Sequence, residues 1–205
     1  MRNMTIEELY EKLSSKEFQD TEHGDIFYNF YLFQYDPSQE YAIREQIELF
    51  KTNLSRPTNY IDVLALNLFE EFCKFLDGMP FGRLHPSQLQ YFLEKDNAGG
   101  NDAVLTSLNA KANSRQFYEY IHNRIMEHIN ADTDNKKPYI FLYGIGSMFP
   151  FMRTNTFLSN YEEFNKTSQY KNIVFKPGNS VGNSYSQFGH INDQHTYRAI
   201  KLIND

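Results

Sequence analysis

Two glycines with an arginine beyond them form the part of the sequence that comes closest to known chemistry. Gly144 and Gly146 follow the apolar run YIFLY, residues 139–143, and Arg153 comes shortly afterwards. Glycines between a strand and a helix let backbone N–H groups approach an anion, and an arginine can hold a phosphate or carboxylate with two hydrogen bonds. Phe149, however, stands where the third glycine of the dinucleotide-binding pattern belongs, and the chain has no G-x-x-x-x-G-K-[ST] sequence. The pattern therefore favours a tight structural turn over a nucleotide site.

A second turn signal follows another short apolar run. Pro177 and Gly178 come directly after NIVFK, in which residues 172–175 are expected to form a strand. Proline fixes φ and glycine accepts a positive φ, so this pair predicts a turn without requiring a function. Because the carboxyl ends of parallel strands meet at one edge of a sheet, we expect this turn to lie beside the one at Gly144.

Histidine and aspartate side chains gather near the end of the chain, where they could ligate a metal. His190, Asp193 and His195 offer nitrogen and oxygen ligands within a short stretch. A zinc site needs three or four ligands in a defined geometry, and the chain has neither H-E-x-x-H nor C-x-x-C. The stretch is interpreted as a polar surface loop, in which Asp193 could pair with Arg153 or Arg198. We expect no metal and no catalytic residue.

Cysteine content and charge narrow the class of protein. Cys73 is the single cysteine, which excludes an internal disulfide and favours a reducing cytoplasm; its apolar neighbours predict a buried thiol without catalytic use. No apolar stretch approaches the ~18 residues of a membrane span, and the polar residues 1–20 do not resemble a signal peptide. The net charge of -6 argues against a general nucleic-acid coat. The acidic beginning and the basic last third are interpreted as a solvated, dipolar surface, with two partner surfaces as the alternative.

Hydrophobic periodicity predicts the strands and helices that position these turn and loop residues. A chain of 205 residues is expected to form a single domain over residues 1–205. Apolar runs predict strands over residues 26–35, 60–66, 139–143, 172–175 and 197–203. Amphipathic stretches and capping signals predict helices after the capping box of Thr5 and Glu8 and over residues 38–54, 67–76, 87–95, 114–130 and around 157–161. Ser38 and Asn67 are the expected N-caps of the helices that start there. Loops are expected over residues 78–86, 96–102 and 178–187.

The alternation of strands and helices sets the fold class. It predicts an α/β fold in which a mostly parallel sheet is flanked by helices on both faces. Such a fold is Rossmann-like or P-loop-like, here without a Walker A motif. The sequence shows neither an internal repeat nor a long linker.

An ordered set of residues in the last third of the chain resembles a known family. A run of the form G-[IV]-G-S-x-[FY]-P-F-[ILM]-R is followed by a strand ending in [FY]-x-P-G and by D-x-x-x-Y-R-A, as in the BrxB family of BREX (bacteriophage exclusion) systems. The matching residues are Gly144, Gly146, Pro150, Phe151, Arg153, Phe175, Pro177, Gly178, Asp193, Tyr197, Arg198 and Ala199. Length and element order agree over the whole chain, whereas the distinctive motifs cover only residues 139–203. The Asn- and Ser-rich loop after Gly178 departs from the pattern.

The resemblance implies a role in bacterial phage defence. BREX systems combine a PglX-like DNA methyltransferase, a PglZ-like protein related to alkaline phosphatases, a large ATPase and small accessory proteins. No complete active site is evident, so the first hypothesis is a non-enzymatic, cofactor-free adaptor that binds a larger subunit. The PglZ-like protein is the expected partner, and the PglX-like methyltransferase is a further one. Contact with DNA is expected to be only indirect. Because interface anchors are often aromatic, this hypothesis predicts a large, rigid apolar patch on the surface.

Two alternatives remain open. The first is a nucleotide- or anion-binding regulatory module that uses the glycine turn over residues 144–153. The second is a DNA-binding or nuclease accessory module that uses the basic last third of the chain, which would show salt-sensitive DNA binding.

Overall fold

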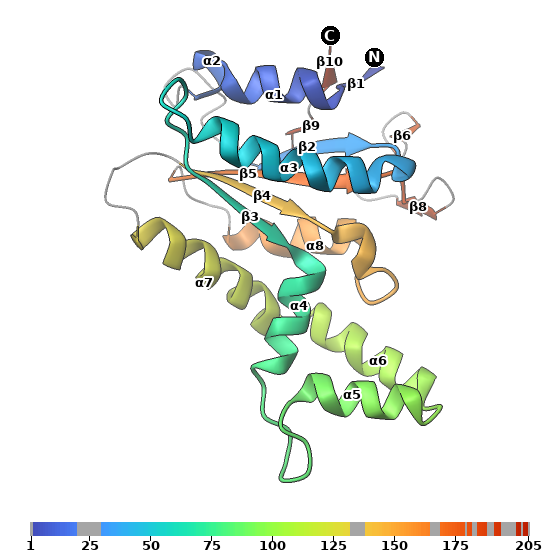
Figure 1. Ribbon diagram of the computed structural model, residues 1–205. Coiled ribbons are helices and arrows are strands. Elements are labelled where there is room, and N and C mark those ends of the chain that lie inside the picture. The colour runs from blue at the N-terminus through green and yellow to red at the C-terminus, as the bar shows by residue number, and fades with distance from the viewer. Residues whose placement is uncertain are drawn as a thin grey trace.

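A parallel β-sheet forms the centre of the protein. The computed structural model describes residues 2–19, 30–131, 138–164, 169–178, 180–181, 184–187, 191–193, 200–201 and 203–204. The sheet has the strand order β3-β4-β5-β2-β9, and all its pairings are parallel (Figure 1). Its strands are β2 (Phe30–Tyr35), β3 (Val63–Asn67), β4 (Tyr139–Tyr143), β5 (Lys171–Pro177) and β9 (Ile200–Lys201). The predicted α/β class with a parallel sheet is confirmed.

Helices cover both faces of the sheet (Figure 1). On one face lie α1 (Ile6–Ser14), α2 (Lys16–Gln19) and α3 (Glu40–Leu54); on the other lie α4 (Leu68–Asp77), α7 (Arg115–Ala131) and α8 (Thr154–Tyr161). Successive side chains of a strand point to opposite faces. Phe33 of β2 and Phe175 of β5 therefore join the core under α1 and α3, whereas Leu32 and Val174 join the core under α4, α7 and α8.

Capping side chains set where several helices begin. The predicted capping box is present: Thr5 Oγ1 accepts from the backbone N–H of Glu8 at 3.3 Å, and Glu8 Oε2 accepts from the N–H of Thr5 at 2.7 Å. The sequence predicted Ser38 as the N-cap of α3, but the structure shows a different start. Instead the Asp36 carboxylate accepts from the N–H of Ser38 at 2.8 Å, which starts the 3-10 helix η1 (Pro37–Gln39), and α3 begins only at Glu40.

Two helices extend beyond α4, away from the sheet (Figure 1). They are α5 (Gln88–Asn97), which was expected, and α6 (Asn101–Ala112), which was not. The pair Gly99-Gly100 is typical of a loop, but it occupies only the link, where Gly99 has a φ of +85°. Apolar residues such as Ala103 and the exposed Leu105 are spread around α6, so its sequence shows no clear amphipathic stripe.

Short strands replace two regions that were expected to be loops. β6 (Ser180–Val181), β7 (Ser184–Gln187) and β8 (Ile191–Asp193) form a small antiparallel sheet, although the sequence predicted a polar loop over residues 178–187 and another around Asp193. Strands this short and polar show no alternating apolar pattern. β1 (Arg2–Asn3) pairs with β10 (Ile203–Asn204). Of the strand predicted over 197–203, the structure shows β9 and the first residue of β10; residues 197–199 and 202 lie outside the described part. No helix in the described part is long and apolar enough to cross a bilayer.

Candidate functional site

The glycine turn after β4 is fitted closely against the start of α4. Gly144 has a φ of +72°, and a Cβ added to it would lie 2.2 Å from Oδ1 of Asn67. That oxygen accepts hydrogen bonds from the backbone N–H groups of Phe69 at 3.1 Å and Glu70 at 3.4 Å, which makes Asn67 the predicted cap of α4. The glycine is therefore required by its backbone conformation and by the neighbouring helix cap.

The same turn is filled by its own residues. It forms the 3-10 helix η2 (Ile145–Met148), in which the side chains of Ile145 and Met148 are fully buried. The backbone N–H of Ser147 donates to the carbonyl of Gly144 at 3.1 Å, and Arg44 Nη2 donates to the Ser147 hydroxyl at 3.1 Å. These contacts favour the structural interpretation of the turn over a phosphate cradle.

The second turn lies at the same edge of the sheet, as expected. β4 and β5 are parallel neighbours, and η2 contacts β5. Gly178 has a φ of +131°; its N–H donates to the carbonyl of Tyr35 at 2.9 Å, and its carbonyl accepts from Gln34 Nε2 at 2.7 Å. Pro177 and Gly178 thus join the end of β5 to the end of β2.

The remaining predicted residues are placed only in part. Arg153 is exposed and precedes the first residue of α8. Asp193 ends β8, but its side chain and the whole of Tyr197 and Arg198 lie outside what the structure describes, so the suggested pairings of Asp193 do too. The two histidines of that stretch, at 190 and 195, also lie outside it. Within the described ranges no three His, Cys, Asp or Glu side chains gather as metal ligands would.

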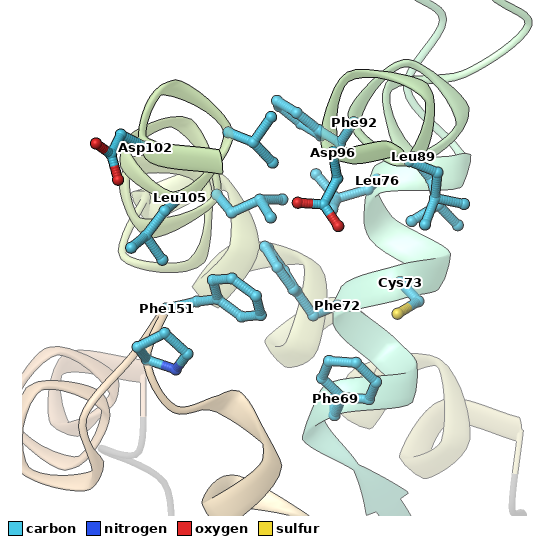
Figure 2. Close-up of a pocket in the computed structure, with 14 residues that line it drawn as sticks. Phe69, Phe72, Cys73, Leu76, Leu89, Phe92, Asp96, Asp102, Leu105 and Phe151 are labelled. Carbon is cyan, nitrogen blue, oxygen red and sulfur yellow. The ribbon is translucent and has the colours of Figure 1, made fainter. Parts of the chain in front are cut away.

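The described structure contains an apolar groove, called here the α4–α6 groove (Figure 2). It has a volume of about 430 Å³, and α4, α5 and α6 surround it together with the turn at Pro150 and Phe151. The lining is almost entirely apolar and includes Phe69 and Phe72 of α4 and Leu105 of α6. Two motif residues of the family resemblance, Pro150 and Phe151, therefore help to build it.

Large apolar side chains of the groove remain in contact with solvent. Leu93 of α5 is 55% exposed, Leu105 is 39% exposed and Phe69 is 36% exposed. Burying apolar surface is favourable by about 25 cal/mol per Å². A cluster of exposed apolar side chains around a hollow is therefore typical of an interaction site rather than of an ordinary protein surface.

The floor of the groove is held in place by the protein core. Phe72, Phe92 and Val104 are buried in the core that the sheet shares with α4, α7 and α8. The ring of Phe72 packs against Phe151, with 6.4 Å between centroids. Asn113, at the end of α6, donates from Nδ2 to the carbonyl of Phe151 at 2.9 Å, which fixes the turn to the helix. The groove is thus preformed.

Charged groups in the lining are few and all negative. Among the described residues that line it, only Asp96 and Asp102 are charged, and Figure 2 shows the carboxylate of Asp96 pointing into the groove. Cys73 also lines it and is half-buried rather than fully buried as expected. Burial raises the pKa of the Cys73 thiol, and the nearby charge of Glu70 raises it further, so the thiol is protonated at neutral pH.

The sequence did not predict this groove. On α5, Leu93 looks in the sequence like an ordinary core-facing residue, and Leu105 belongs to α6, which was not expected as a helix. The one available signal was the phenylalanine pair on α4, because Phe69 and Phe72 are separated by one helical turn and fall on the same face as Cys73.

The chain is similar to known proteins of one family. The family model described as "BREX protein BrxB" matches residues 79–202, a range that includes α5, α6 and both turns. A BREX protein BrxB of Bacillus cereus (strain H3081.97) is 25% identical over 206 residues, which cover 98% of this chain and 97% of that protein. No solved structure shows significant similarity. The resemblance expected from the glycine, proline and arginine motifs is confirmed, and the chain belongs to the BrxB family of BREX proteins.

Proposed function

We propose that this protein is a non-enzymatic adaptor that binds a larger BREX subunit through the α4–α6 groove. Membership of the BrxB family makes the chain a component of a BREX phage-defence system. The observation that supports an adaptor is the preformed apolar groove with Leu93, Leu105 and Phe69 exposed around it. This is the rigid apolar patch that the adaptor hypothesis required.

A preformed groove favours tight binding for a physical reason. Ordering flexible interface side chains on association makes the binding free energy less favourable, and this cost is small where the side chains are already fixed. Phe72 and Phe151 are fixed by ring packing and by the hydrogen bond from Asn113. A partner side chain that enters the groove meets a surface that need not rearrange.

The negative charge of the groove indicates which class of partner it can bind. Asp96 and Asp102 repel phosphate groups, so the groove is unsuited to direct contact with nucleic acid. A protein partner is therefore favoured. We propose the PglZ-like subunit as this partner and the PglX-like methyltransferase as a second contact within the assembly.

Co-purification with each co-encoded subunit tests the proposal. The tagged protein is passed over a size-exclusion column with each neighbour at low and at high salt. We expect one salt-resistant complex, because apolar contacts are not screened by ions. If the protein elutes alone in every combination, the adaptor function is refuted.

A matched pair of variants locates the binding surface. Leu93→Asp places a charge in the groove, whereas Leu49→Asp makes the same change on α3, which covers the other face; the two leucines are 55% and 51% exposed. We expect Leu93→Asp to weaken the complex by about tenfold or more and Leu49→Asp to leave it unchanged. Equal effects of the two variants would show that binding takes place elsewhere.

A chemical footprint gives a measurement without substitution. Cys73 is the single cysteine and lines the groove, so N-ethylmaleimide labels only this thiol. We expect the partner to slow the labelling, as followed by intact-mass spectrometry. Labelling at an unchanged rate in a complex that is stable by chromatography would place the partner away from the groove.

A further inference from the structure

We propose that the α4–α6 groove binds an amphipathic helix of the partner, and that a Lys or Arg on this helix pairs with Asp96. The inference rests on the proposed function and adds the chemistry of the occupant. It identifies Asp96 as the residue that selects the partner, while the apolar lining provides the binding surface.

The walls of the groove favour a helix over an extended peptide. An extended peptide satisfies its backbone hydrogen bonds by adding to the edge of a sheet. This groove is built from α4, α5 and α6 and has no sheet edge, and the interior of a helix has no unpaired backbone groups to offer. An occupant that satisfies its own backbone, as a helix does, therefore fits this groove better than one that needs a sheet edge.

The size of the groove shows how such a helix would sit. A three-turn helix is about 10 Å across and about 16 Å long, and the groove is an open hollow of about 430 Å³ between α4, α5 and α6. Its apolar lining suits the apolar side chains of such a helix. The helix would lie across the opening, next to exposed Leu93 and Leu105, and insert apolar side chains at positions i, i+3 or i+4, and i+7.

Asp96 provides the selective contact because its charge has no partner. Its carboxylate points into the groove and is not engaged in a hydrogen bond or ion pair with any residue that the structure describes (Figure 2). The adjacent Lys95 lies over the ring of Tyr91 instead, 5.8 Å from its centroid. An apolar helix that covered Asp96 would strip water from the carboxylate without compensation, whereas a Lys or Arg would compensate for it.

The position of Asp96 in its helix supports a binding role. Asp96 lies in the last turn of α5 (Gln88–Asn97), where a negative charge opposes the helix dipole. Asp102 lies in the first turn of α6, where a negative charge is stabilising. Local helix stability therefore explains Asp102 but not Asp96. A residue that destabilises its own helix and points into a binding groove is explained by recognition.

Stability and binding are expected to change in opposite directions. Asp96→Asn removes the unfavourable charge and should raise the Tm by about 1–3 °C. Asp96→Lys should do the same and weaken the complex with the PglZ-like subunit by about tenfold or more, since it places a positive charge against the partner's cation. The control is Asp77→Lys, which makes the same change at the exposed last residue of α4, outside the groove lining, and should leave binding unchanged.

A charge exchange identifies the other half of the contact. Lys→Glu and Arg→Glu substitutions along the surface helices of the PglZ-like subunit are tested against Asp96→Lys, and one of them should restore the lost affinity. The inference is overturned if Asp96→Lys binds as well as the unchanged protein, or if no single exchange restores it. A complex that is lost with Leu93→Asp but retained with Asp96→Lys would leave the docking groove standing and refute only this inference. A failure of the unchanged protein to bind any subunit would refute the proposed function itself.

Discussion

Substitution of Gly144 measures how tightly the family's glycine turn is coupled to the helix beside it. In Gly144→Ala, the alanine must adopt a φ of +72°, and its Cβ must share space with Asn67 Oδ1, only 2.2 Å away. Asn67 can avoid this contact only by giving up the hydrogen bonds that cap α4. The turn and the cap are thus expected to fail together.

Two contributions set the size of the effect. The left-handed conformation costs a residue with a Cβ about 1–2 kcal/mol. Loss of an Asn cap costs about 1 kcal/mol. We therefore expect Gly144→Ala to lower the free energy of unfolding by about 2–3 kcal/mol, which corresponds to a fall in Tm of about 5–10 °C for a chain of this length.

Gly99→Ala provides the matched control. Gly99 has a φ of +85°, but a Cβ added there would find no atom within 4 Å. It isolates the conformational cost, so Gly144→Ala should be about 1 kcal/mol more destabilising in urea unfolding. In an Asn67→Ala background, which removes the obstructing amide, the cost of Gly144→Ala should fall to that of Gly99→Ala. Equal costs for the two alanines in the unchanged protein, or no coupling between positions 67 and 144, would refute the reasoning.

Three further predictions concern the groove and its surroundings. Glu71 is nearly buried, and although burial raises its pKa, hydrogen bonds from Lys74 and Tyr120 and the charges of Lys74 and Arg124 lower it overall. The ionised Glu71 therefore stabilises the fold fully above the pKa of about 4.3 that Glu has in the unfolded chain, and this stabilisation is lost as the pH falls through the lower pKa of the folded protein. Glu71→Gln should lower the free energy of unfolding by about 2 kcal/mol at pH 7 and by progressively less towards pH 3, as urea unfolding at each pH can show. Labelling of Cys73 by N-ethylmaleimide should accelerate about tenfold per pH unit between about pH 7 and 8, because its pKa is raised and thiolate is the reactive form; a rate independent of pH would contradict this. Millimolar ATP should leave the Tm unchanged, and a clear rise would revive the nucleotide-binding alternative.

The sheet could be predicted from the sequence because its strands have strong boundaries. YIFLY between Pro138 and Gly144 is an uninterrupted apolar run, and β4 spans Tyr139–Tyr143 as predicted. Asn67 has a short polar side chain at the start of an apolar helical stretch, and it caps α4 as predicted. In both cases neighbouring residues alone determine the outcome.

The groove could not be predicted because it depends on how helices pack. α6 shows no amphipathic stripe and follows two glycines, so its sequence resembles a loop. Whether Leu93 faces the core or the solvent is decided by the position of α6 relative to α5, which no local pattern records. Of the candidate motif residues, Pro150 lines the groove together with the neighbouring Phe151, whereas the contacts found for Gly144 and Gly178 are those of packing and turn formation.

The pairing of β1 with β10 brings the two ends of the chain together at the pole opposite α5 and α6 (Figure 1). Arg2 lies opposite Asn204, so a short linker could join the ends and convert the chain into a closed ring. New ends could then be opened in the exposed segment around Leu84, between α4 and α5. The same geometry lets a neighbouring domain be fused to either terminus while the groove stays accessible, so the protein can be tethered at one pole and engage a partner at the other.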